Sequence, residues 1–127
     1  GLTISGAAAA QDDTKPAAPE AVWVKNKILI CDIRQAQTCR SEGCVAGPKA
    51  PAFRLDLTKR SLCGLNERGC INEQRIGQIG LDPNNTRMAV HALGFALVLS
   101  VDANGAMNGA DLVRGRVVVF HGQCRPG

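Results

Sequence analysis

Six cysteines and two histidines are the residues of this 127-residue chain most able to do chemistry. The cysteines are Cys31, Cys39, Cys44, Cys63, Cys70 and Cys124. Their spacing contains no Cys-x-x-Cys knuckle, no Cys-x-x-Cys-His haem signature and no nearby pair of histidines, which argues against a metal or haem site. We expect no cofactor and no metal ion. An even number of cysteines in a short chain is typical instead of a disulfide framework.

Six cysteines allow fifteen pairings, and spacing alone does not decide among them. Cys39 and Cys44 enclose four residues with a glycine at the turn, so a hairpin would bring their sulfurs together. Cys63 and Cys70 enclose six residues of the same character. The favoured set is therefore Cys39 with Cys44, Cys63 with Cys70, and Cys31 with Cys124. The last bond would close a loop of about 90 residues and contribute roughly 4 kcal/mol in the chain-entropy description.

The histidines, His91 and His121, would form a catalytic or metal-binding pair only if their strands were neighbours. A structural role at a strand end is the favoured interpretation. A Ser–His–Asp set can be drawn from Ser61 or Ser100 with His121 and Asp102, but nothing in the local sequence selects it. A hydrolase that uses His91 or His121 is therefore the least favoured function.

Acidic residues give no stronger signal for catalysis. Asp56 and Glu67 are interpreted as surface residues near turns, so paired carboxylates for glycoside chemistry are not indicated. The stretch Asp102–Gly105 resembles the start of a calcium loop but lacks the later ligands, which favours a simple turn. A P-loop, a G-x-G-x-x-G fingerprint and a G-x-S-x-G elbow are all absent from the sequence. The sequence thus predicts a protein that is not an enzyme.

The elements that would position these residues are strands, because large apolar residues recur with a period of two. The clearest run is Phe95–Val101, where Phe95, Leu97, Leu99 and Val101 alternate with smaller residues. Asn104-Gly105 then predicts a hairpin, since both residue types tolerate positive φ. Asn108-Gly109 repeats the signal and is interpreted as a bulge or a wider loop.

The closing apolar run, Arg116–His121, follows a break at Gly115 and is apolar on both faces, which predicts a central strand covered on both sides. The other predicted strands are Ile28–Ile33 (opened by Val22–Val24), Phe53–Leu57, Arg60–Cys63 and Arg87–Leu93, with Ile71–Ile79 either a strand or a helical turn at Asn72–Arg75. Asp82–Asn85 is predicted to be a turn. About eight short strands with frequent turns indicate an all-β fold, a small antiparallel barrel or sandwich stapled by disulfides.

Composition divides the chain into four parts. Residues 1–10, GLTISGAAAA, are interpreted as the remnant of a signal peptide, with the alternative of an Ala-rich tail. Residues 11–20 are a polar, proline-containing linker, residues 21–124 the disulfide-stapled β-domain, and residues 125–127 a tail. Ten apolar residues are too few to span a bilayer, which takes roughly 20, so we expect no transmembrane segment. The protein is predicted to be exported, to the periplasm or outside the cell.

The net charge is +4, and from Ala21 onward fourteen basic residues face eight acidic ones, a net charge of +6. A mild positive charge favours an anionic or acidic partner. Five arginines could form a basic strip: Arg54, Arg60, Arg68, Arg75 and Arg87. The scarcity of aromatic residues removes the stacking platform for single-stranded nucleic acid, so nucleic acid is not expected as a partner. Trp23 is predicted to lie in the core or at one end of a barrel.

Several of these features together resemble a group of small, exported, cysteine-containing proteobacterial proteins of uncharacterised function. The features are Trp23, Cys31, Cys39, the Glu42-Gly43-Cys44 turn, the Cys63 and Gly69-Cys70 pair and the closing Gly122-Gln123-Cys124. The resemblance covers most of Trp23–Cys124. It implies the architecture and says nothing about activity.

The favoured function is a non-enzymatic exported binding or accessory module that acts through a protein surface. Its partner would be another envelope protein or complex, with Val45–Ala52 and Met88–Val101 as candidate interface segments. Trp23, Arg54 and Arg60 are the candidates for contact with a ligand or partner. The alternative is a small β-barrel that binds an apolar ligand, with Trp23 at its mouth.

Overall fold

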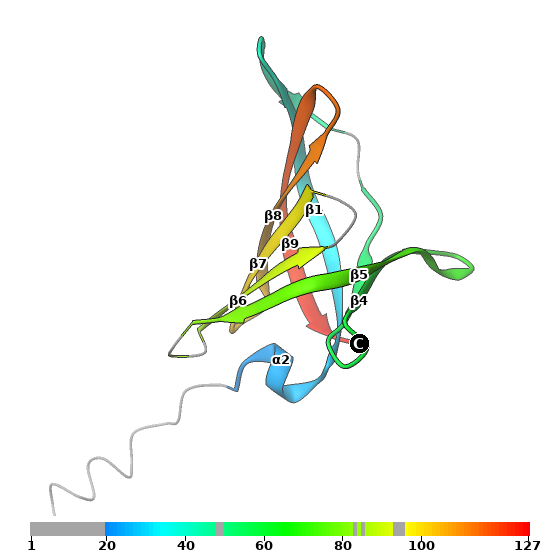
Figure 1. The fold of residues 1–127 in the computed structure, drawn as a ribbon, viewed down its shortest axis with the longest axis vertical. Helices are drawn as coiled ribbons and strands as arrows, with labels where there is room; N and C mark the ends of the chain where they lie inside the picture. The colour runs from blue at the N-terminus through cyan, green and yellow to red at the C-terminus, as the bar shows by residue number, and fades with distance from the viewer. Residues whose placement is uncertain (1–19, 48–49, 83, 85, 93–95) are drawn as a thin grey trace, which may run out of the picture.

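A computed structural model of the chain describes residues 20–47, 50–82, 84, 86–92 and 96–127. Within these ranges it contains one short helix and nine strands (Figure 1). They are α2 (Val22–Lys25), β1 (Ile28–Arg40), β2 (Gly43–Ala46), β3 (Phe53–Asp56), β4 (Ser61–Asn66), β5 (Gly69–Leu81), β6 (Arg87–Ala92), β7 (Ala96–Asp102), β8 (Ala106–Val113) and β9 (Arg116–Pro126). The proposed signal remnant and nearly all of the proposed linker lie outside the described residues, as do Leu93 and Phe95.

The strands form a closed antiparallel barrel, which confirms the all-β prediction and decides between a barrel and a sandwich. Each strand from β3 to β9 pairs with the next, and β1 pairs with both β3 and β9. The barrel wall therefore has eight strands, β1 and β3–β9. The ninth strand, β2, extends the far half of β1 as a hairpin that projects beyond the barrel (Figure 1). Closure leaves few free strand edges, which limits unwanted pairing with other chains.

The barrel is filled by inward-facing residues of the eight wall strands. The alternation predicted for Leu97, Leu99 and Val101 is confirmed, since these side chains belong to or pack against the core. Other fully buried side chains are Leu29, Leu55, Ile76, Met88 and Met107. Trp23 lies in the same core with only 3% of its surface exposed, as predicted. It is carried by α2, a single helical turn at one end of the barrel, where the sequence indicated the opening of a strand (Figure 1).

The three disulfides are those that the spacing favours. Cys31–Cys124 lies inside the barrel and joins β1 to β9, with both cysteines at most 2% exposed. Cys39–Cys44 staples the β1–β2 hairpin, and Cys63–Cys70 staples the β4–β5 hairpin. Both hairpins extend outward from the body of the barrel (Figure 1). Three disulfides are typical of proteins that fold in an oxidising compartment.

Two predictions about turns differ in outcome. The hairpin at Asn104-Gly105 is confirmed: Gly105 adopts φ +94°, and Asp102 Oδ1 accepts the backbone N–H groups of Asn104 and Ala106, both at 2.9 Å. The second signal, Asn108-Gly109, is neither a bulge nor a loop, because both residues pair within β8. Gly109 is needed there for packing. A Cβ at this position would lie 2.4 Å from Cζ of Phe120, so the glycine makes room for the aromatic ring.

Two further predictions are corrected. Ile71–Ile79 is part of the long strand β5, so the helical-turn alternative at Asn72–Arg75 is wrong; Asn72, at φ +51°, lies at a bulge opposite β4. Asp56 is not a surface residue, because it is only 6% exposed and its Oδ1 accepts the backbone N–H of Lys59 at 2.9 Å. Its carboxylate stabilises the predicted turn between β3 and β4.

The last strand also differs from its prediction. β9 continues past Cys124 to Pro126, and the backbone N–H of Gly127 donates to the carbonyl of Ile28 at 2.8 Å. Only one of its faces is covered: Val119 is 36% exposed and His121 is also exposed. The apolar outer face of β9 is therefore part of the protein surface.

The disulfides should differ in their contribution to stability according to loop length. Removing Cys31–Cys124, which spans 93 residues, with paired alanine substitutions should lower the free energy of unfolding by about 4–5 kcal/mol. Removing Cys39–Cys44, with a separation of 5, should cost only about 2 kcal/mol. Urea unfolding followed by circular dichroism measures both, and equal losses would contradict the chain-entropy explanation.

Replacing Gly109 with alanine should force Phe120 out of position and lower the free energy of unfolding by about 1–3 kcal/mol. Gly80→Ala is the matched control, because a Cβ at Gly80 meets no atom within 4 Å. It should change stability by less than about 0.5 kcal/mol. Similar values for the two variants in thermal or urea unfolding would show that Gly109 has no packing role.

Candidate binding groove

One edge of β1 is shared between two partner strands that leave a gap between them. The near half of β1 pairs with β3 as far as Cys31, and the far half pairs with β2 from Gln37 onward. Across the five residues between them, Asp32–Ala36, the described residues make one backbone bond to this edge, from Gly47 N–H to the carbonyl of Ala36 at 2.8 Å. The opposite edge of the same segment pairs with β9.

Two adjoining hollows lie beside this edge, with volumes of about 680 and 490 Å³. They share Ile33, Arg34 and Ala50, so together they form one groove that follows β1. Its floor is Asp32–Gln37, and its far wall is Ala46–Gly47 and Ala50–Ala52. Each of the two volumes falls in the range of about 300–1,000 Å³ that is typical of ligand pockets.

The chain is shaped locally to leave this space. β1 has a bulge between Ile33 and Gln35, which adds Arg34 as an extra residue opposite β9 and bends the strand. The wall beside it is built from alanines, Gly47 and Pro51. All of these residues are small, and Pro51 also lacks a backbone N–H donor. Large side chains in these positions would fill the groove.

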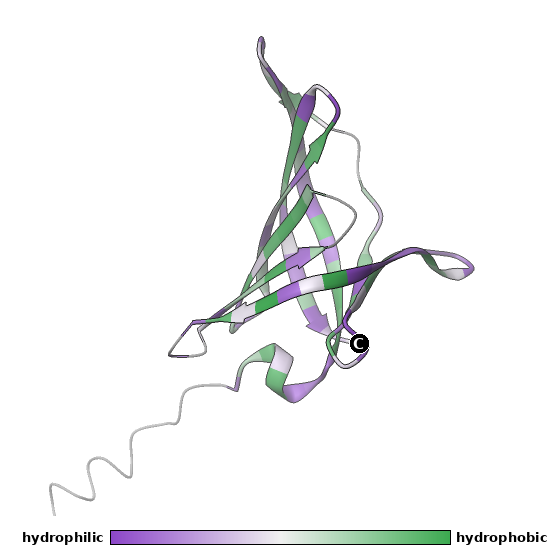
Figure 2. Cartoon of the chain, in the orientation of Figure 1, coloured by the Kyte–Doolittle hydropathy of each residue, from purple (hydrophilic) through white to green (hydrophobic). Residues whose placement is uncertain are grey.

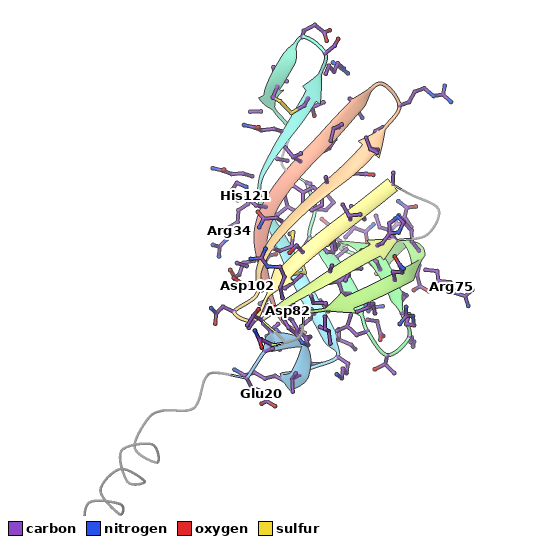
Figure 3. The ribbon with its side chains drawn as sticks, turned by 60° about the vertical axis from the view of Figure 1, so that its left-hand side comes forward. Glu20, Arg34, Arg75, Asp82, Asp102 and His121 are labelled. Atoms are coloured by element: carbon purple, nitrogen blue, oxygen red, sulfur yellow. A yellow bond between two sulfur atoms is a disulfide. The ribbon has the colours of Figure 1, made fainter. Side chains whose placement is uncertain are left out.

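Among the described residues that line the groove, one cation, Arg34, makes no ion pair. The Asp32 carboxylate is engaged by the Arg125 guanidinium of β9 in an ion pair whose two side chains are 50% and 56% exposed. Arg34 is exposed on the bulge and makes no ion pair with any described residue (Figure 3). The remaining polar groups are the amides of Gln35 and Gln37. This arrangement suits backbone carbonyls or a carboxylate of a bound chain.

The residues considered for catalysis are not brought together. His91 lies on β6 and His121 on β9, with β7 and β8 between them, and both are exposed on the outer face (Figure 3). Glu67 is exposed at the tip of the β4–β5 hairpin, beyond the end of β4, whereas the buried Asp56 pairs with Ser61 at the start of β4. The described part of the chain holds no group of three or more His, Cys, Asp or Glu residues arranged for a metal ion.

The predicted basic strip is only partly assembled. Arg54 lies on β3, Arg60 follows in the β3–β4 turn and donates to the Gly77 carbonyl at 3.3 Å, and Arg75 lies on β5 (Figure 3). Arg68 stands at the tip of the β4–β5 hairpin, while Arg87 lies on β6 away from the others. Arg54 and Arg60 thus occupy one side of the barrel, and the role suggested for them as partner contacts stays a prediction. Trp23, the third candidate, is enclosed in the core.

Asp111 is an inward-facing carboxylate on β8, in register with Leu97 and Val118. Its Oδ1 is buried and has no hydrogen-bond partner among the described residues. Burial raises the pKa of this carboxyl, because the charged form loses water that nothing replaces. Since it stands alone between apolar neighbours, Asp111 lacks the second group that acid–base chemistry would require.

The far wall of the groove lies within Val45–Ala52, which the sequence analysis named as a candidate interface segment, and that role stays a prediction. The floor was missed, because Arg34–Cys39 is only a polar stretch before the Cys39–Cys44 turn in the sequence. No family model, no curated protein and no solved structure matches the chain. The resemblance to small exported proteobacterial proteins therefore stays a prediction. No helix in the described ranges is long and apolar enough to cross a membrane.

Asp111→Asn should stabilise the protein at neutral pH. The raised pKa means that the folded protein holds this proton more tightly than the unfolded chain does. The contribution of Asp111 to stability is therefore complete below its unfolded pKa, about 3.9, and is lost as the pH rises through the folded value. The variant should exceed the wild type in urea midpoint at pH 7, and the difference should vanish near about pH 3. Glu67→Gln, at an exposed hairpin tip, should show no such trend.

Proposed function

We propose that this protein is a non-enzymatic exported binding module that holds an extended segment of a partner protein in the groove along β1. The single observation that carries the proposal is the short stretch of β1 edge between β3 and β2, which lies beside a groove large enough for a peptide. An exposed strand edge is a template for an added strand, because its backbone groups hydrogen-bond any extended chain.

The dimensions limit what the groove accepts. The edge from Asp32 to Ala36 spans five residues, or about 16 Å of extended chain. It therefore fits a segment of about four to six residues rather than a full-length strand. Small apolar walls favour small or aliphatic side chains in the segment, and Arg34 favours an acidic side chain or a chain carboxylate beside it.

The compartment and the partner follow from the same features. Three disulfides and the signal-like residues 1–10 support an exported protein, for which the periplasm is the proposed location. The partner is then another protein of the cell envelope, and the net charge of +6 from Ala21 onward favours one with an acidic surface.

The alternative, a carrier of apolar ligands, receives less support. Such a ligand would need space inside the barrel, where Leu29, Leu55, Ile76, Met88 and Met107 are packed together. Trp23 would also have to move, since its ring is part of the same core.

A photo-reactive amino acid at Gln35 should cross-link the partner in an extract of the source envelope, whereas the same group at Glu73 on β5 should not. Ala50→Trp should fill the groove and abolish the cross-link, and Ala50→Ser should leave it intact. Mass spectrometry of the cross-linked peptide identifies the bound segment. Capture that is equal for both Ala50 variants would overturn the proposed site, because it would not depend on the groove.

A further inference from the structure

A second surface lies on the outer side of β6–β9 and adjoins the groove strand β1 through β9. We call it the neutral face and define it as every second residue of Ala89–His91, Ala96–Ser100, Asn108–Leu112 and Val117–His121. The register of β6–β9 places these eleven side chains on the outer side of the wall. None of them is Asp, Glu, Lys or Arg, in a chain of which 20% of residues are charged.

The neutral face is also apolar where it is most exposed. Leu112 is 63% exposed, Val98 49% and Val119 36%. The hydropathy of β9 is on the hydrophobic side in its first half, and hydrophilic residues lie at the β8–β9 turn and at the C-terminal end of β9 (Figure 2). Contiguous exposed apolar residues of this kind mark interaction surfaces.

Its shape is a ridge between two hollows. Val98 and Leu112, on β7 and β8, form the ridge. One hollow of about 290 Å³ is lined by residues of β5, β6 and β7, including Ala89 and His91. Another of about 290 Å³ is lined by residues of β8, β9 and β1, including Asn108 and His121.

The charges at the two ends of the neutral face are opposite. Arg114 and Arg116 stand at the β8–β9 turn, beyond one end. Asp82 and Asp102 stand at the other end, together with Arg87 (Figure 3). A hydrogen bond from the Thr86 side chain to Asp82 lowers the pKa of that carboxyl, with further backbone donors from Thr86 and Arg87. Asp82 is thus ionised at neutral pH.

A two-fold axis through the middle of the face would match these ends. Ala110 is the middle residue of the β8 part, with Arg114 four residues beyond it and Ala106, whose N–H binds Asp102, four residues before it. Rotation by 180° about an axis that lies in the face, crosses the strands and passes through Ala110 therefore brings Arg114 of one copy over the Asp102 end of the other. We propose that the neutral face binds a second copy of this chain, with β7 and β8 of the two copies antiparallel across the axis.

The size of the face sets the strength of this association. Four strand segments of three to five residues, about 10–17 Å long and about 4.8 Å apart, cover about 300 Å² per copy. That is about 600 Å² in total, below the size of stable specific interfaces, so the dimer should be weak, with a dissociation constant of about 100 μM or above. The net positive charge of the domain would oppose other orientations.

Sedimentation velocity on the purified, oxidised protein tests the proposal. From about 5 μM to about 1 mM the wild type should pass from monomer to dimer. Leu112→Lys places two unpaired charges in the interface and should raise the dissociation constant at least about tenfold. Arg114→Glu reverses the charge match and should do the same, most strongly at low salt.

Two matched controls introduce the same changes elsewhere. Val45→Lys, at an aliphatic residue of β2 that is 65% exposed, and Arg68→Glu, at the β4–β5 hairpin tip, should leave the dissociation constant unchanged. Circular dichroism confirms that every variant is folded. A wild type that stays monomeric at 1 mM, or a dimer that Leu112→Lys does not weaken, would overturn the proposal. The proposal would also be overturned if the chain stayed monomeric and bound a different protein through Leu112. Ala50→Trp should not affect the dimer, which separates this result from that of the groove.

Discussion

The barrel closes where β1 meets β9, and every other feature of the molecule depends on that pairing. Ten residue pairs join the two strands, including Cys31 with Cys124. The backbones approach so closely beside the disulfide that a Cβ on Gly122 would lie 1.8 Å from the carbonyl oxygen of Asp32. Without this contact β1 and β9 would each present a long free edge, and the core residues of the last four strands would lose their cover.

The same strand that closes the barrel creates the groove. β1 has thirteen residues and pairs with β9 along nearly all of them, so its other edge must be shared between β3 and β2. Neither partner reaches the middle, where the bulge at Arg34 bends the strand. The gap in pairing is therefore a consequence of a long strand with two short neighbours, which is a backbone constraint rather than a property of particular side chains.

Sequence reasoning succeeded where the pattern was local. Period-two alternation put Leu97, Leu99 and Val101 on one face of a strand, which is the face that packs in the core, and the short cysteine spacings led to the disulfides by elimination. It failed where the role of a residue depends on a partner that is distant in the sequence. In the sequence Gly109 is typical of a turn, but in the structure it lies opposite Phe120 and makes room for the aromatic ring. Asp56 was interpreted as a surface residue, but in the structure it is buried at the β3–β4 turn. The groove and the neutral face also depend on the register in which the strands pair, and a local sequence pattern does not reveal that register.

The distance along the chain between the two closing strands has a kinetic meaning. The seam joins residues 93 positions apart, so its loop-closure entropy must be overcome before the contact gives any stabilisation. The hairpins closed by Cys39–Cys44 and Cys63–Cys70 need no such search. A chain made from its N-terminus would hold β1 with one edge waiting for a partner until the last residues emerge. The pairing of β9 with β1 thus sets how long an edge of β1 stays unpaired during folding. A delay in the synthesis or pairing of Arg116–Pro126 would prolong the time in which that edge can pair with other chains.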